Sequence, residues 1–394
     1  MGSIYQRLTH PFPKFFIGPG KVHEVAERVA QEQCDLVIFD DELTPAQTRN
    51  LEKELNIGVL DRTALILDIF AQHAHTHEGR LQVELAQYNY LLPRLRRQWT
   101  HLERQAGGGG MSAGGVVGLR GPGETQLELD RRLINQRINW LKEQLAHVHR
   151  HRELYRKRRR QSGIPVVALV GYTNAGKSTL MNALTDADVR AEDQLFATLD
   201  PTTRQIVLPG GQLMLLTDTV GFIQKLPTQL VAAFRATLEE IREADLLLHI
   251  IDFTHPNAQE QAHTVENTLR DLGIVDRPML TVLNKVDRMP GIGETEVSSL
   301  AEELGMPHDY IAISAQRGWG LQGLFMRIEQ ALAQTMVALD AFIPYQRNDL
   351  VALWHQRGLV ESQEFVADGT HLQGRIPRIL ARQFADFVVQ GLVL

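Results

Sequence analysis

The sequence predicts a multidomain α/β protein whose central domain holds a mostly parallel sheet. Over residues 162–336, short apolar runs rich in β-branched residues alternate with helical stretches, as in a sheet whose crossovers are helices. Before them, apolar residues recur every three or four positions on both sides of a glycine-rich segment, which is typical of two long packed helices. We expect a small N-terminal α/β domain (1–77), an antiparallel helical hairpin (78–161) with a glycine-rich tip (106–123), a P-loop domain (162–336) and a small C-terminal α+β module (344–394).

The N-terminal part alternates strands with a helix. Leu36–Phe39 and Gly58–Leu60 are expected strands. Pro45–Leu55 is an expected helix, and Thr44 is its expected N-cap. This alternation favours a parallel sheet.

The helical hairpin is predicted from two apolar seams. Their spacings alternate between four and three, so each helix presents one apolar stripe to the other. The first seam comprises Leu81, Leu85, Tyr88, Leu92, Leu95, Trp99 and Leu102, and the second Leu127, Ile134, Ile138, Leu141, Leu145 and Val148. The second helix is expected over Glu124–Arg160, and Pro93 is expected to kink the first. The tip between them fits either a disordered connector or a mobile probe that enters a narrow partner site.

A phosphate-binding loop opens the central domain. The apolar run Ile164–Val170 is typical of a buried strand and leads into Gly171–Ser178, Gly-Tyr-Thr-Asn-Ala-Gly-Lys-Ser, which fits GxxxxGK[ST] and begins a helix. In this context the backbone N–H groups hold phosphates at the helix N-terminus. Lys177 is expected to reach the β- and γ-phosphates, and the Ser178 hydroxyl to ligate Mg²⁺. The loop alone leaves ATP and GTP both open.

A second motif identifies the base as guanine. Asn284-Lys285-Val286-Asp287 fits NKxD, and a carboxylate at Asp287 accepts both the N1–H and the N2–H₂ donors of guanine. Adenine offers no such pair of donors. Ser314-Ala315-Gln316 follows the expected strand Tyr310–Ile313, which places a backbone N–H near guanine O6. GTP is therefore the predicted substrate.

Two segments complete the expected hydrolytic site. Asp218-Thr219-Val220-Gly221 follows the strand Leu213–Leu216, so the Asp218 carboxylate suits Mg²⁺ and the Gly221 N–H suits the γ-phosphate. The segment Phe196–Arg204 supplies hydroxyls, and spacing leaves open which threonine binds the metal.

The residue that follows Gly221 is Phe222, which cannot orient or deprotonate water. We therefore expect slow intrinsic hydrolysis that a partner accelerates. Gln194 and Gln224 are candidates to orient the water within the chain itself.

These motifs resemble the HflX family of ribosome-associated GTPases, which belongs to the translation-factor-like GTPases. The resemblance covers essentially the whole chain and is carried by Phe196–Arg204, Asp218–Pro227, Leu60–Gln72 and Gly118–Glu128. It implies that Thr198 is the Mg²⁺-binding switch threonine. It also implies that the glycine-rich tip enters the peptidyl-transferase region of the large ribosomal subunit, and that binding dissociates stalled or stressed ribosomes.

The expected site falls into three groups. The GTP-binding residues are Gly171, Tyr172, Thr173, Asn174, Ala175, Gly176, Lys177, Ser178, Phe196, Ala197, Thr198, Leu199, Asp200, Asp218, Thr219, Val220, Gly221, Asn284, Lys285, Asp287, Ser314, Ala315 and Gln316. The catalytic residues are Lys177, Thr198 and Gly221, and the Mg²⁺ ligands are Ser178, Thr198 and Asp218.

Composition and charge bound the partners. The net charge of −6 gives no global signal for nucleic acid, so RNA contact is expected locally at the basic run Arg150–Arg160, for which a solvated linker helix is the other interpretation. No apolar run is long enough to span a bilayer, and the lone Cys34 fits a reducing cytoplasm. We expect a cytoplasmic monomer. An ATP- or GTP-driven RNA-remodelling enzyme and a GTP-regulated protein scaffold remain the alternatives.

Overall fold

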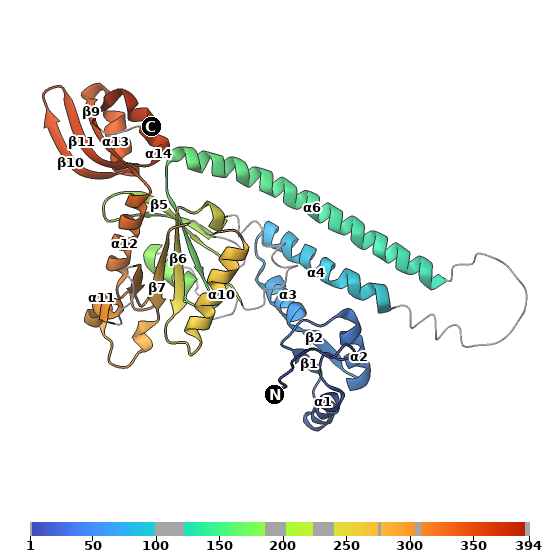
Figure 1. Cartoon of the computed structure of the whole chain (residues 1–394). Coiled ribbons are helices and arrows are strands. Elements are labelled where there is room, and N and C mark those ends of the chain that lie inside the picture. Colours follow the sequence, from blue (N-terminus) through green and yellow to red (C-terminus); the bar gives the residue numbers. More distant parts are fainter. Residues whose placement is uncertain are drawn as a thin grey trace, which may run out of the picture. The chain divides into compact units, whose positions relative to one another are not determined.

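The computed structural model describes residues 2–98, 122–185, 202–223, 240–274, 277–303 and 309–390. Among these residues, contacts divide the chain into two compact units, the first ending at Ala146 and the second beginning at His147. Figure 1 shows their elements, coloured along the sequence. In the described residues no helix is long and apolar enough to cross a membrane. The domain boundaries expected above stay predictions.

The first unit begins with a small α/β fold. Its elements are α1 (Pro19–Glu32), β1 (Leu36–Phe39), α2 (Pro45–Leu55), β2 (Gly58–Asp61) and α3 (Arg62–His73). The two strands pair in parallel, as the alternation predicts. The predicted N-cap is also confirmed, because the Gln47 N–H donates to Thr44 Oγ1 at 3.3 Å and the Gln47 side chain accepts from the Thr44 N–H at 2.9 Å.

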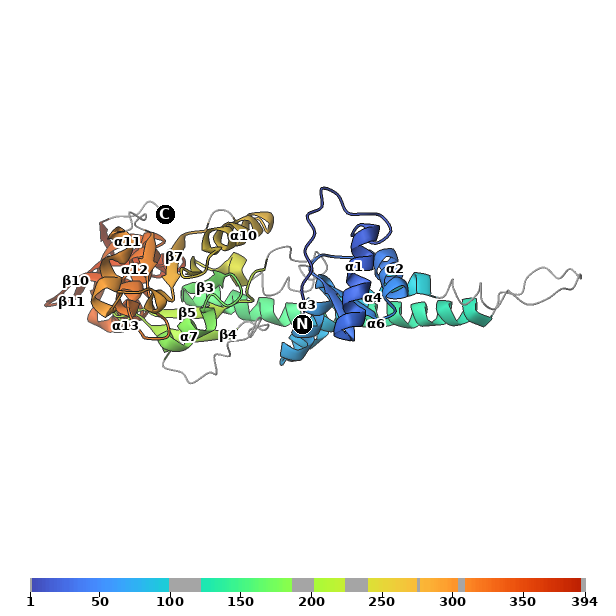
Figure 2. The ribbon, with the colours of Figure 1, turned by 90° about the horizontal axis from the view of Figure 1, so that it is seen from below.

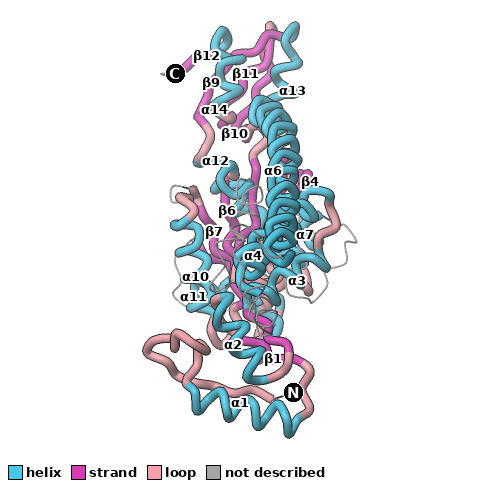
Figure 3. The backbone as a smooth tube through the Cα atoms, turned by 90° about the vertical axis from the view of Figure 1, so that its right-hand side faces the viewer, coloured by secondary structure: helices cyan, strands magenta, loops and turns pink. Residues whose placement is uncertain are grey.

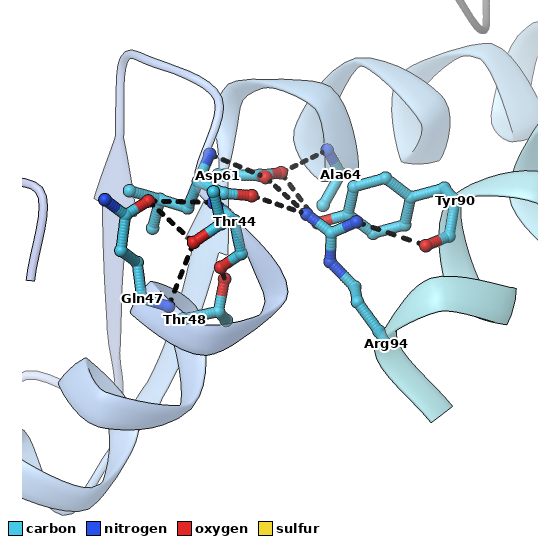
Figure 4. A network of polar contacts seen from close by, with 8 residues as sticks. Thr44, Gln47, Thr48, Asp61, Ala64, Tyr90 and Arg94 are labelled. Atoms are coloured by element: carbon cyan, nitrogen blue, oxygen red, sulfur yellow. Dashed lines mark hydrogen bonds and ion pairs between the residues drawn. The ribbon is translucent and has the colours of Figure 1, made fainter. Parts of the chain in front are cut away.

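A buried polar network joins this fold to the next helix, α4 (His77–Gln98). Asp61 is fully buried at the end of β2 and accepts hydrogen bonds from the Ala64 N–H, the Tyr90 hydroxyl and the Arg94 guanidinium. The guanidinium also lies over the Tyr90 ring, 3.3 Å from its centroid. Figure 4 shows how these side chains converge from two helices and a strand. The network fixes α4 to the α/β fold.

Helices α4 and α6 (Pro122–Ser162) form the predicted antiparallel pair. Leu81 of α4 is buried with Leu141 and Leu145 of α6. Beside them, Arg137 donates to both carboxylate oxygens of Glu84 at 2.7 and 3.0 Å. Helix α4 continues through Pro93. Figure 2 shows the two helices side by side, and Figure 3 shows α6 as one uninterrupted helix. Most of the glycine-rich tip lies outside the described residues.

The second unit contains the predicted sheet. In spatial order its strands are β4 (Thr202–Val207), β5 (Leu213–Asp218), β3 (Val166–Gly171), β6 (Leu246–Asp252), β7 (Met279–Asn284) and β8 (Tyr310–Ala312). All neighbours pair in parallel except β4 and β5, which pair antiparallel. The parallel strands are apolar on both faces because helices cover both, as expected of such a sheet.

Helices divide between the two faces of the sheet. Helices α7 (Lys177–Thr185) and α12 (Leu321–Gln334) share one core with β3 and β6. Helix α10 (Ala258–Asp271) covers the other face, as Figure 1 shows. A short 3-10 helix (Val286–Arg288) and α11 (Glu294–Glu303) follow β7. The carboxyl ends of β3, β5, β6 and β7 therefore meet at one edge, where parallel sheets place their ligand sites.

The C-terminal module is an antiparallel sheet packed on a helix. Its strands lie in the order β10 (Leu359–Val366), β11 (Gly369–Ile376), β9 (Val337–Pro344) and β12 (Val388–Gln390). Helix α13 (Asn348–Arg357) packs on the sheet through Trp354, which is fully buried. The sequence of this module predicts a helix over Leu350–Gln356, strands over Val360–Val366 and Thr370–Ile376, and a helix over Arg378–Val389. Helix α13 and strands β10 and β11 agree with the first three of these.

Strand β9 begins before the expected start of the module at residue 344, and its Leu339, Ala341 and Ile343 belong to the core of the module. One expectation for this module is wrong. The expected helix Arg378–Val389 is only partly helical. A four-residue helix, α14 (Arg378–Ala381), is followed by a 3-10 helix and by β12, because pairing with β9 overrides the local helical pattern.

Candidate nucleotide-binding site

The phosphate-binding loop connects β3 to α7 through a tight turn. Asn174 and Gly176 both adopt a positive φ, of 61° and 96°. A side chain at Gly176 would collide with the Asn284 amide, so only glycine fits there. Tyr172 and Thr173 join the turn to the end of β3, so the backbone N–H groups of the loop gather at the N-terminus of α7.

Lys177 is buried inside this loop. Its ammonium group donates to the Gly171 carbonyl at 3.2 Å and to the Tyr172 carbonyl at 2.9 Å. Burial lowers the pKa of Lys177 to about 8, against the raising effect of Asp218, while Lys285 lowers it further. A buried ammonium held by two neutral carbonyls is only partly compensated, and it is therefore suited to attract a phosphate.

Two of the three expected metal ligands lie together. The Ser178 hydroxyl, at the start of α7, donates to Asp218 Oδ2 at 2.7 Å, and Asp218 at the end of β5 is 2% exposed. A hydroxyl and a carboxylate this close are hard oxygen donors of the kind Mg²⁺ prefers, so these residues fit the ion. The third expected ligand, Thr198, lies outside the described residues, as do Phe196, Ala197, Leu199 and Asp200.

The neighbouring threonines belong to strand β4. Thr202 lies opposite Asp218 in the ladder, and the Thr203 hydroxyl is 3.0 Å from the Thr217 hydroxyl. The Thr203 side chain is thus engaged in the sheet. Neither the motif nor its spacing could assign this pairing.

The segment after Asp218 is bridged to the phosphate-binding loop. The Phe222 N–H donates to the Gly171 carbonyl at 3.0 Å, and the Thr173 N–H donates to the Phe222 carbonyl at 2.9 Å. A Cβ on Gly221 would stand 2.8 Å from Thr173 Cγ2 and 3.1 Å from Lys177 Nζ, so this close approach requires glycine. The Phe222 side chain is 3% exposed. It is buried in the protein and cannot take the place of a water-orienting glutamine.

Thr219 and Val220 lie between Asp218 and Gly221. The Thr219 hydroxyl donates to the Leu169 carbonyl at 2.5 Å, which ties the segment to β3. Val220 is half-buried beside it. The Thr219 side chain therefore holds the segment in place.

The NKxD motif is fastened to the phosphate-binding loop. The Asn284 amide donates to the Ala175 carbonyl at 2.9 Å and its oxygen accepts from the Ala315 N–H at 3.0 Å. Lys285 Nζ donates to the Asn174 carbonyl at 2.7 Å. These contacts place the base-recognition motif directly beside the phosphate-binding loop.

Asp287 stands at the outer end of the motif. The Ser314 hydroxyl donates to Asp287 Oδ1 at 2.6 Å and in turn accepts from the Arg317 N–H at 3.1 Å. Ser314 is buried, whereas Gln316 is exposed. Ser314 thereby holds the carboxylate in one orientation, as the expected double hydrogen bond to guanine requires.

One supporting residue was missed by the motif search. Asp252, at the end of β6, lies opposite Asn284 and forms an ion pair with Lys285 at 2.8 Å. Partial burial acts to raise the pKa of Asp252, but hydrogen bonds from Lys285 and Thr254 outweigh it and hold the pKa below its ordinary value. Its position at the carboxyl end of a parallel strand is the signal that could have identified it.

Three family models match the chain in succession. They are described as a GTP-binding GTPase N-terminal region (residues 1–71), a GTP-binding GTPase middle region (residues 73–159) and a 50S ribosome-binding GTPase (residues 166–285).

Curated relatives named GTPase HflX align along nearly the whole chain. The Escherichia coli K12 protein is 46% identical, over 93% of this chain and 84% of that protein. The Lacrimispora saccharolytica protein is 45% identical, over 98% of this chain and 87% of that protein. Among solved structures, a GTP-binding protein from the archaeon Sulfolobus solfataricus in complex with GDP is 29% identical, over 84% of this chain and 90% of that chain, with a TM-score of 0.43.

Proposed function

Because the chain belongs to the HflX family of GTPases, we propose that it binds the large ribosomal subunit in its GTP state and dissociates stalled or stressed ribosomes. The protein hydrolyses GTP to GDP and phosphate. The observation that carries the proposal is the physical connection between the phosphate-binding loop and NKxD, made by Asn284 and Lys285. The ribosomal target is supported by the description of one matching family, a 50S ribosome-binding GTPase.

The geometry supports the proposed binding roles. Backbone N–H groups of Gly171–Ser178 hold the phosphates, and Asp287, with a backbone N–H of Ser314–Gln316, recognises guanine. Ser178 and Asp218, with Thr198, would hold Mg²⁺, which when bound neutralises charge that develops on the β- and γ-phosphate oxygens. Lys177 exchanges two carbonyl partners for the phosphates, which strengthens its hydrogen bonds because the new acceptors are charged.

Hydrolysis is slow without a partner under this proposal. The Phe222 side chain is buried and has no polar atom that could orient the attacking water. Gln194 and Gln224 lie outside the described residues. We propose that the ribosome supplies a water-positioning group, so that turnover accelerates on binding.

We call the segment Gly221–Ile223 the gate, because we propose that its arrangement depends on the bound nucleotide. Its bridge to the phosphate-binding loop brings Gly221 close to Lys177, where the γ-phosphate of GTP would arrive. GDP lacks that phosphate. GTP therefore selects a different arrangement of this segment, and we propose that this arrangement is the ribosome-binding state.

Ribosomal RNA is the proposed contact of the arm. The basic run Arg150–Arg160 lies on α6, and its positive charge suits the phosphates of RNA. The glycine-rich tip is the second proposed contact. A cytoplasmic monomer is the form we propose for this role.

Sedimentation with ribosomes tests the gate. The protein should co-sediment with 50S subunits in a non-hydrolysable GTP analogue, and far less in GDP or without nucleotide. Incubation of 70S ribosomes with the analogue-bound protein should increase free 50S and 30S subunits in a sucrose gradient. Equal co-sedimentation in all three nucleotide states refutes the gating proposal, and unchanged 70S levels refute dissociation.

Charge reversal tests the arm. Replacing Arg156, Arg158 and Arg160 by glutamate should weaken ribosome binding and flatten its salt dependence. The matched control reverses three exposed arginines outside α6, which are Arg270, Arg277 and Arg382. Equal losses in both variants would point to net charge rather than to the arm, and no loss in either would favour the protein-scaffold alternative.

A further inference from the structure

His249 is a buried histidine that none of the roles above uses. It lies in the middle of β6 and is 1% exposed. Leu248 and Ile250, its neighbours along the strand, join the core shared with α7 and α12. Because successive side chains of a strand point to opposite faces, His249 points to the face that α10 covers.

Neither ring nitrogen of His249 has a hydrogen-bond partner in the part of the chain that the structure describes. Nearly all buried polar groups in folded proteins are paired, because an unpaired one lowers stability. A leucine of similar size would occupy this place without that cost. Burial, reinforced by the nearby charge of Lys177, lowers the pKa of His249 to about 4, so the ring is neutral and offers one donor and one acceptor.

The ring lies close to the point where the phosphate-binding loop meets the gate. His249 is opposite Val170 in the sheet, and Val170 directly precedes Gly171. The Gly171 carbonyl accepts from both Lys177 Nζ and the Phe222 N–H. His249 therefore lies beside the residue that precedes this carbonyl, whose two contacts would change when a γ-phosphate binds under the proposed function.

The segment Gly221–Ile223 is itself buried. Phe222 and Ile223 are 3% and 6% exposed, so their side chains anchor the segment in the protein interior. When the Gly221 N–H turns toward a phosphate, the neighbouring peptide groups turn with it. Any carbonyl or N–H that turns inward then needs a partner, because buried backbone polar groups are almost always paired.

We propose that His249 is a positioning residue for the segment Gly221–Ile223, and that its ring forms a hydrogen bond with the backbone of this segment only when the γ-phosphate is bound. This inference rests on the proposed contact between Gly221 and the γ-phosphate. Without GTP the ring is unpaired, and this lowers the stability of the nucleotide-free arrangement. The GTP-bound arrangement is favoured because only there does the ring form a hydrogen bond.

The test compares His249→Leu with His249→Asn in the full chain. Fluorescent GDP and a fluorescent non-hydrolysable GTP analogue are titrated with Mg²⁺, and the ratio of their dissociation constants is the readout. His249→Leu should raise the melting temperature of the nucleotide-free protein by about 2–4 °C. It should also weaken analogue binding about fivefold, the value of one hydrogen bond, and leave GDP binding unchanged. His249→Asn, which keeps a neutral donor and acceptor, should recover part of this loss.

Thr281→Val is the matched control, since Thr281 is buried opposite His249 on the adjacent strand β7. It should leave the ratio unchanged. An unchanged ratio in His249→Leu overturns the proposal, as does a lower melting temperature, which would mean that the ring has a partner without nucleotide. The ratio is measured without ribosomes, so its outcome is independent of the co-sedimentation that tests the proposed function. If the leucine variant does not fold, the asparagine variant and His249→Gln give the same comparison.

Discussion

Replacing Arg94 by methionine should strongly destabilise the first unit. Asp61 is fully buried, and Arg94 is its one ion-pair partner among the described residues, at 2.8 Å. Hydrogen bonds from the Leu43 N–H, the Ala64 N–H and the Tyr90 hydroxyl would remain, but the buried charge would lose its compensation. Removing one partner of a buried pair costs about 3–5 kcal/mol. Methionine keeps the length of the side chain, so the loss measures charge more than packing (Figure 4).

Urea unfolding followed by circular dichroism measures this loss. Mg²⁺ and a GTP analogue stabilise only the unit that binds them, so the transition that does not move on adding nucleotide belongs to the first unit. Arg94→Met should lower the midpoint of that transition and leave the nucleotide-sensitive one unchanged. Asp61→Asn combined with Arg94→Met should be more stable than Arg94→Met alone, because no charge stays buried. A single variant that unfolds at the wild-type urea concentration would refute the reasoning.

Three further predictions concern the GTPase domain. Asp287→Asn should weaken GTP binding about 100-fold, since two hydrogen bonds to a charged group are lost, and it should improve xanthosine triphosphate binding in competition assays, while ATP remains a poor competitor. Gly176→Ala should weaken GTP and GDP alike by about tenfold or more, measured by nucleotide titration, because its φ is 96° and the new methyl group displaces Asn284. The acid sensitivity of folding should decrease in His249→Leu. The folded-state pKa of His249 is about 4, against an ordinary 6.5, so between these pH values unfolded chains take up a proton that folded chains do not. Stability therefore falls by about 3 kcal/mol as the pH is lowered through this range. Melting temperatures from pH 4 to 8 measure the difference between the variant and the wild type.

The sequence was sufficient to predict the central sheet and the order of its motifs. Runs such as Leu246–Asp252 and Met279–Leu283 are apolar on both faces, which only a covered parallel strand tolerates. The phosphate-binding loop was predictable because its tight turn requires glycine locally, as the positive φ of Gly176 shows. The hairpin was predictable from its period, which Leu81, Leu141 and Leu145 confirm.

What could not be predicted depends on contacts distant in sequence. Strand β9 carries alanine and aspartate among its apolar residues, so its pattern is weak until β11 and β12 pair on its two sides. The residues of β12 follow a helical stretch and become a strand only through this pairing. Asp252 acquires its role from Lys285, 33 positions later, and His249 belongs to no motif at all. Local propensity carries no information about such partners.

The NKxD motif contacts two different parts of the protein, the phosphate-binding loop and Ser314, and this difference decides which variants are informative. Asn284 and Lys285 contact the carbonyls of Ala175 and Asn174, so they shape the loop that holds the phosphates of any nucleotide. Asp287 contacts Ser314 instead and makes no hydrogen bond to that loop among the described residues. Removing Asn284 should therefore lower affinity for every nucleotide, whereas removing the charge of Asp287 should change only which base is accepted. We therefore expect base identity and phosphate affinity to be separable in this protein, because different side chains of one motif contact the phosphate-binding loop and Ser314.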